Sequence, residues 1–142
     1  MSGYAIFLGK SLISWKTKKQ KTVSTSSAES EYRCLSYTSR ELVWLVYLLQ
    51  DLRVKVPLPL VLYCDNKAAN HIAHNPVFHE RTKHLNIDCH YVKEKLEEGF
   101  LIPKFVRSQF QIADIMTKAL GIQLHHFFCK QLGVHSFKVH PP

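Results

Sequence analysis

One stretch of helical periodicity constrains the fold of this chain more than any other feature. From Ser27 to about Leu52, apolar side chains recur at steps of three, four and seven residues, at Ala28, Tyr32, Leu35, Leu42, Val46 and Leu49. Just before this stretch, Ser26 and Glu29 have the spacing of a capping box. A helix of about 26 residues would be ~39 Å long, which is long for one domain. Any fold of this chain must accommodate that helix.

Shorter apolar segments surround the helix in the order of a mixed α/β fold. We expect a hairpin of Tyr4–Leu8 and Leu12–Trp15, strands over Leu60–Cys64 and Phe100–Val106, and helices over Lys67–Ala73, Leu85–Leu96, Ala113–Leu120 and Leu124–Leu132. Pro103 favours an edge position for the last strand. Trp15 and Trp44 lie within apolar runs, so we expect both in the core. The order predicts a mixed sheet with helices packed on it.

Composition excludes several classes of protein. The 142 residues are 46% apolar, which is typical of one globular domain. The four cysteines form no C-x-x-C pair, which favours reduced thiols and an intracellular, cytoplasmic location. No apolar run approaches the ~18 residues of a membrane span, and the N-terminus lacks the features of a signal peptide. The net charge of +8 favours a polyanionic partner.

Three carboxylates occupy positions suited to chemistry. Asp65 follows the Leu60–Cys64 strand, where open α/β sheets place their sites. Glu31 lies one turn into the long helix, and Asp114 lies at the start of a later helix. Each also has a structural explanation. Asp65 could cap a helix, Asp114 could complement a helix dipole, and Glu31 could lie on a solvated face.

Several motifs in a fixed order resemble the ribonuclease H domain of copia-type retrotransposon polyproteins. They are Ser2-Gly-Tyr4, Ile13-Ser-Trp-Lys16, Ser27-Ala-Glu-Ser-Glu-Tyr32, Glu41-Leu-Val-Trp-Leu45, Tyr63-Cys-Asp-Asn66, His79-Glu-Arg-Thr-Lys-His-Leu85 and Ala113-Asp-Ile-Met-Thr-Lys-Ala-Leu120. The resemblance covers about Ser2 to Val134. It implies a ribonuclease H-like domain over residues 1–134 and a short tail over residues 135–142.

The resemblance implies an activity and a site. The family cleaves RNA in RNA–DNA hybrids with carboxylates that hold two Mg²⁺ ions, and its metal ligands fall on Glu31, Asp65 and Asp114. Implied partners are the hybrid and the rest of a Pol polyprotein, including reverse transcriptase. A virus-like particle is an alternative location that the resemblance implies. The nucleic-acid contacts it suggests are Lys18, Lys19, Asn66, His79, Arg81, Lys83 and His84. A solvated surface is the alternative for the basic residues, both in the Lys16–Lys21 strip and in the His79–His84 segment.

A zinc site is the other reading of this histidine-rich region, which contains His71, His74, His79, His84, Cys89 and His90. These residues lack the paired spacing of a structural zinc site, which argues against it.

One departure from the family affects the functional expectation. The family's first carboxylate is an Asp on a first strand upstream of the hairpin, central in the sheet order 3-2-1-4-5, and no acidic residue of this chain precedes Glu29. We therefore expect an N-terminally truncated domain, with a gap between the hairpin and the Leu60–Cys64 strand, that is inactive alone. The alternatives are an inactive remnant that binds nucleic acid non-specifically and a fragment without function.

Overall fold

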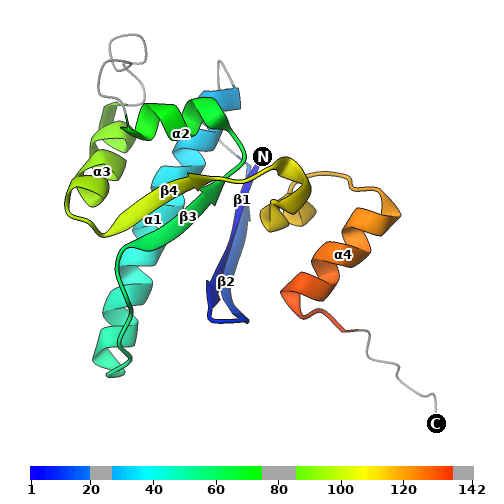
Figure 1. The fold of residues 1–142 in the computed structure, drawn as a ribbon, viewed down its shortest axis with the longest axis horizontal. Helices are drawn as coiled ribbons and strands as arrows, with labels where there is room; N and C mark the ends of the chain where they lie inside the picture. The colour runs from blue at the N-terminus through cyan, green and yellow to red at the C-terminus, as the bar shows by residue number, and fades with distance from the viewer. Residues whose placement is uncertain (20–26, 75–85, 136–142) are drawn as a thin grey trace.

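The computed structural model describes residues 1–19, 27–74 and 86–135 of the chain (Figure 1). In chain order its elements are β1 (Ser2–Leu8), β2 (Ser11–Lys18), α1 (Ser27–Asp51), β3 (Leu60–Cys64), α2 (Lys67–His74), α3 (Asn86–Glu97), β4 (Leu101–Phe105), the 3₁₀ turns η3 (Ser108–Phe110) and η4 (Ile112–Met116), and α4 (Ile122–Leu132). This composition of elements confirms the predicted mixed α/β class. The bounds of α1 and β3 follow the sequence pattern closely. No helix in these ranges is both long and apolar enough to cross a membrane.

The described strands form two separate two-stranded sheets. β1 pairs antiparallel with β2, with Ser2 opposite Lys18, whereas β3 pairs parallel with β4, with Leu60 opposite Leu101. No ladder joins β1 to β3 among these strands. This separation agrees with the expected gap between the hairpin and the Leu60–Cys64 strand. The family's five-strand order stays a prediction.

The helix α1 connects the two halves of the fold. Its buried Tyr32 and Leu35 belong to a core cluster with residues of β3, α2 and α3, namely Cys64, Ala69, Ala73, Cys89 and Val92. At this contact the Ser36 hydroxyl donates a hydrogen bond of 2.7 Å to Asp88 on α3. Figure 1 shows α1 passing behind β3 and β4. On β1, the carbonyl of Gly3 accepts a hydrogen bond from the Cys34 thiol of α1 over 3.4 Å. Both sheets are therefore held to one helix.

Both tryptophans were wrongly expected in the core. Trp15 is 61% exposed and Trp44 is 57% exposed. On a helix, consecutive residues are rotated by about 100°, so the burial of Leu45 and Val46 directs Trp44 away from the core. Trp15 lies in β2, which pairs with β1 on one edge. Most residues of β2 are exposed, and Trp15 is one of them.

Two other expectations change at element boundaries. The segment expected to be a helix over Ala113–Leu120 is instead a 3₁₀ turn that ends at Met116, and the Thr117 amide donates to the Asp114 carbonyl over 3.0 Å. β2 extends to Lys18, beyond the expected end at Trp15, so Lys16 and Lys18 lie in a strand. The capping box at Ser26 lies outside the described residues.

Candidate metal and nucleic-acid site

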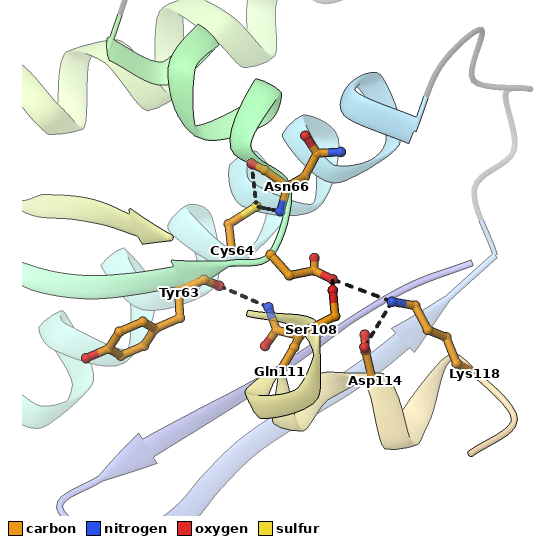
Figure 2. Close-up of polar contacts among 8 residues, drawn as sticks. Tyr63, Cys64, Asn66, Ser108, Gln111, Asp114 and Lys118 are labelled. Carbon is orange, nitrogen blue, oxygen red and sulfur yellow. Dashed lines mark hydrogen bonds and ion pairs between the residues drawn. The ribbon is translucent and has the colours of Figure 1, made fainter. Parts of the chain in front are cut away.

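The three predicted carboxylates come together from three different elements. Glu31 lies on the second turn of α1, Asp65 directly follows β3, and Asp114 lies in η4. One oxygen each of Glu31 and Asp65 and the Cys64 sulfur all lie within 4.8 Å of one another. Asp114 joins them through a shared cation, because Lys118 Nζ lies 2.9 Å from Asp114 Oδ2 and 3.6 Å from Asp65 Oδ2 (Figure 2). The chain therefore builds a carboxylate cluster at the C-terminal end of β3.

Burial and mutual repulsion both act on this cluster. Burial raises the pKa of Glu31, and the charges of Asp65 and Asp114 raise it further, while Lys118 opposes them. Burial likewise raises the pKa of Asp114, against the hydrogen bond and charge of Lys118. Burial alone would lower the pKa of Lys118, but Asp114, Asp65 and Glu31 together raise it. The cluster is thus short of positive charge, and a cation bound among these oxygens would relieve the repulsion.

Asp65 is held in place by its neighbours. Its Oδ2 accepts a hydrogen bond of 2.9 Å from the Ser108 hydroxyl of η3, and Gln111 Nε2 donates to the Tyr63 carbonyl over 3.4 Å (Figure 2). These contacts fix η3 and η4 against the end of β3. The cap of α2 is Asn66 rather than Asp65, because Asn66 Oδ1 accepts the Ala69 amide over 3.0 Å. The carboxylate of Asp65 is therefore left to face the cluster.

The donor set fits a hard divalent cation. Mg²⁺ prefers oxygen ligands, and three carboxylates offer six such atoms. The Cys64 sulfur lies within 4.8 Å of oxygens of Glu31 and Asp65, and burial raises the pKa of its thiol to about 11. At neutral pH this thiol stays protonated, and a protonated thiol is a poor metal ligand. The cluster is therefore suited to magnesium rather than zinc.

Two polar residues of the cluster were not assigned by sequence reasoning. Lys118 stands four residues after Asp114, a spacing at which helical ion pairs form, so its role could have been foreseen. Ser108 gave no such signal, because it reaches Asp65 across 43 positions of sequence. Tertiary folding alone brings that pair together.

The predicted nucleic-acid contacts divide into three groups. Lys18 and Lys19 are exposed, and Lys18 Nζ lies 4.1 Å from the centre of the Tyr37 ring. Lys18 stands opposite Ser2, at the end of the hairpin nearest the cluster. Asn66 is partly buried as the α2 cap. The other predicted contacts lie outside the described residues, and they are His79, Arg81, Lys83 and His84.

Comparison with known proteins shows what the chain is similar to. It is 41% identical over 133 residues to the retrovirus-related Pol polyproteins from transposons RE1 and RE2 of Arabidopsis thaliana, covering 94% of this chain and 9% of each polyprotein. It is 32% identical over 136 residues to that from transposon TNT 1-94 of Nicotiana tabacum, covering 95% of this chain and 10% of the polyprotein. The chain thus spans about a tenth of the length of these relatives. No protein-family model and no solved structure matches it. The similarity supports a retrotransposon-derived domain.

Proposed function

We propose that this chain is a retrotransposon-derived domain of ribonuclease H type, which binds RNA–DNA hybrids and holds Mg²⁺ beside the RNA strand. The observation that supports this most is the convergence of Glu31, Asp65 and Asp114 at the end of β3. These three residues are also the ones that the resemblance assigns as metal ligands. The similarity to Pol polyproteins is a further reason to consider nucleic-acid chemistry.

In this proposal the residues of the chain have separate tasks. Glu31, Asp65 and Asp114 bind the ions, and Ser108 orients Asp65 through its hydrogen bond. Lys118 balances the charge of Asp65 and Asp114 through its two ion pairs, and a bound cation would compete with it for these carboxylates. When bound, Mg²⁺ would supply charge stabilisation for the attacking and leaving oxygens of a phosphodiester.

Recognition of the hybrid rests on charge and shape. The net charge of +8 favours contact with phosphates, and Lys18 and Lys19 are exposed. A protein of this kind reads the backbone and the 2′-hydroxyl groups rather than the base sequence. Three, not four, of the family's carboxylates match residues of this chain. Hybrid binding and hybrid cleavage are therefore separate questions for this chain.

The test combines metal binding with cleavage. Mg²⁺ should raise the melting temperature of the chain, and Asp65→Asn should abolish that increase, whereas the exposed Asp51→Asn should not change it. Hybrid cleavage is then measured in Mg²⁺ with the same three proteins. An unchanged melting temperature in Mg²⁺ would contradict the metal site.

The cleavage assay separates the two functional alternatives. Hydrolysis that requires both Mg²⁺ and Asp65 would show an active enzyme. Hybrid binding without hydrolysis would favour the inactive remnant, and the existing Lys118 ion pair with two of the carboxylates is the observation in favour of that second candidate.

A further inference from the structure

Three aromatic side chains of α1 are exposed and take no part in the carboxylate cluster. Tyr37 is 43% exposed, Trp44 is 57% exposed and Tyr47 is 65% exposed. Large aromatic side chains are usually buried, and a group of exposed ones is typical of a binding surface. Figure 1 shows α2 and α3 beside the start of α1, whereas the later turns of α1 extend beyond both helices. Among the described residues, these turns present an aromatic surface.

The spacing of these residues places them on one face of the helix. Trp44 follows Tyr37 by nearly two full turns, so the two side chains project in almost the same direction. Tyr47 stands one turn after Trp44 and neighbours it on the helix surface. The rise of the helix from Tyr37 to Tyr47 is about 15 Å. We call Tyr37, Trp44 and Tyr47 the aromatic face of α1.

A basic pocket lies at one end of the aromatic face, between α1 and the hairpin. Its volume is about 220 Å³, below the range of drug-sized ligand sites, so it suits a small group such as one phosphate. Three cations line it, namely Lys16 and Lys18 of β2 and Arg40 of α1. Tyr37 and Glu41 line it as well. Three positive charges against the one negative charge of Glu41 leave the pocket basic.

The cations and the aromatic rings of this surface are interleaved. Lys18 Nζ lies 4.1 Å from the centre of the Tyr37 ring. Arg40 stands one turn after Tyr37 and one turn before Trp44, so its side chain lies between them on the helix surface. Although Asp88 lies 3.8 Å from it, the Arg40 side chain is 45% exposed and accessible to a phosphate. Cations combined with exposed aromatic rings are typical of surfaces that bind single-stranded nucleic acid.

This combination favours a single strand over other polymers. Unpaired bases can stack on exposed rings, whereas the bases of a duplex are already stacked and paired. A protein partner fits less well, because the cores of protein interfaces are depleted in lysine and glutamate, and the pocket beside the rings contains both. A stacked strand advances about 3.4 Å per nucleotide, so the length of the aromatic face suits about four nucleotides.

We propose that the aromatic face of α1 and the adjoining basic pocket bind single-stranded nucleic acid. A phosphate of the strand occupies the pocket among Lys16, Lys18 and Arg40. Bases of the same strand stack on Trp44 and Tyr47. This inference goes beyond the proposed function, because the ligand has no second strand and its binding requires no metal ion.

The test measures strand binding by the intact chain in a buffer with EDTA. The probe is a strand of eight deoxythymidines with a 5′ fluorescein, and binding is followed by fluorescence anisotropy. The control probe has the same phosphates and sugars, but a hydrogen atom replaces every base. We expect the thymidine strand to bind about fivefold more tightly or better than the control, because stacking of even one base is worth that factor.

The two tryptophans provide matched variants. Trp44→Ala should weaken binding of the thymidine strand about fivefold or more, and Trp44→Phe should retain most of the affinity, because phenylalanine keeps a ring for stacking. Trp15→Ala removes a tryptophan that is 61% exposed and should leave binding unchanged. The Ser14 hydroxyl contacts Glu41 of α1, and the next residue along a strand points to the opposite face, so Trp15 points away from α1. Circular dichroism establishes that the variants are folded.

Tryptophan fluorescence locates the strand directly. The chain contains two tryptophans, so Trp15→Phe leaves Trp44 as the sole tryptophan, and Trp44→Phe leaves Trp15. A base stacked on an indole ring quenches its emission. Adding an unlabelled thymidine strand should therefore quench the emission of Trp44 and leave the emission of Trp15 unchanged.

Four results would overturn the proposal. They are equal binding of both probes, unchanged binding by folded Trp44→Ala, equal quenching of the two tryptophans, and no binding by the folded chain up to about 1 mM strand. Self-association that Trp44→Ala abolishes, in the absence of any strand, would also overturn it, because the aromatic face would then belong to a protein interface. Since neither Mg²⁺ nor a hybrid is present, failure here leaves the proposed function unaffected.

Discussion

At the scale of single residues, ionisation of the Glu31 carboxylate lowers the stability of the folded state. Its pKa is raised by burial first and by Asp65 second. A raised folded-state pKa means that the contribution of Glu31 to stability is complete below its unfolded pKa and is lost as the pH rises through the folded value. In the absence of metal, the domain should therefore lose stability across that interval. Glu31→Gln cannot ionise and avoids this loss.

We expect Glu31→Gln to melt about 2–4 °C higher than the natural chain at neutral pH in EDTA, which corresponds to about 1 kcal/mol in a chain of this size. The difference should disappear below about pH 4, where both proteins carry an uncharged side chain. Glu97→Gln, on the exposed surface of α3, serves as the control and should change little. A lower melting temperature for Glu31→Gln in EDTA would mean that the ionised carboxylate is stabilised, not strained.

The Lys118 ammonium offsets part of the repulsion among these carboxylates. It is the cation that contacts Asp65 and Asp114 in the described chain. Lys118→Met should lower the melting temperature in EDTA, because it leaves two partly buried carboxylates close together without it. It should also increase the stabilisation that Mg²⁺ provides. Lys104→Met, at an exposed position of β4, is the matched control. Equal effects of Mg²⁺ on the two variants would separate Lys118 from the metal site.

At the scale of elements, the cap of α2 distinguishes a structural role from a binding role. Asn66 was predicted to contact nucleic acid, and its side-chain oxygen accepts the Ala69 amide at the start of α2. We expect Asn66→Ala to lose about 1 kcal/mol of stability in urea unfolding, and Asn66→Asp to retain most of it, because aspartate also caps well. If Asn66 acts only as a cap, both variants should bind hybrid like the natural chain. If folded Asn66→Ala binds hybrid more weakly than the natural chain, the predicted contact of Asn66 with nucleic acid is supported.

The elements also show which parts of the fold could be predicted from the sequence. The bounds of Leu60–Cys64 were predicted fully, since Pro59 and the Asp65-Asn66 pair delimit a short apolar run. The structure of the segment after Gln111 was not predicted, because its apolar pattern is typical of an α-helix. In the folded chain this segment is a 3₁₀ turn that packs against β1. Thr117 lies so close to Gly3 that a Cβ atom there would stand 2.8 Å away. The candidate site residues Glu31, Asp65 and Asp114 were predicted from family motifs, and Ser108 was missed because only the folded chain brings it to Asp65.

At the scale of the whole molecule, charge should dominate the contact with nucleic acid. A protein that neutralises phosphates releases counterions, so log K falls linearly with log salt by about 0.9 for each phosphate contact. With a net charge of +8, this chain should bind RNA–DNA hybrid with a steep slope. Base sequence should have little influence, because shape and backbone are recognised. The slope, rather than one affinity, is therefore the informative measurement.

Lys18 is the residue through which this slope can be tested. It is exposed and stands opposite Ser2, at the end of the hairpin beside the carboxylate cluster. If Lys18 contacts a phosphate, Lys18→Ala should reduce the slope by about one unit and weaken binding equally for different hybrid sequences. Lys55→Ala removes the same charge beyond the opposite end of α1, so it should leave the slope unchanged. Equal slopes for both variants and the natural chain would place the hybrid away from the hairpin. The basic strand end would then be a solvated surface, and the phosphate contacts would have to come from another face of the molecule.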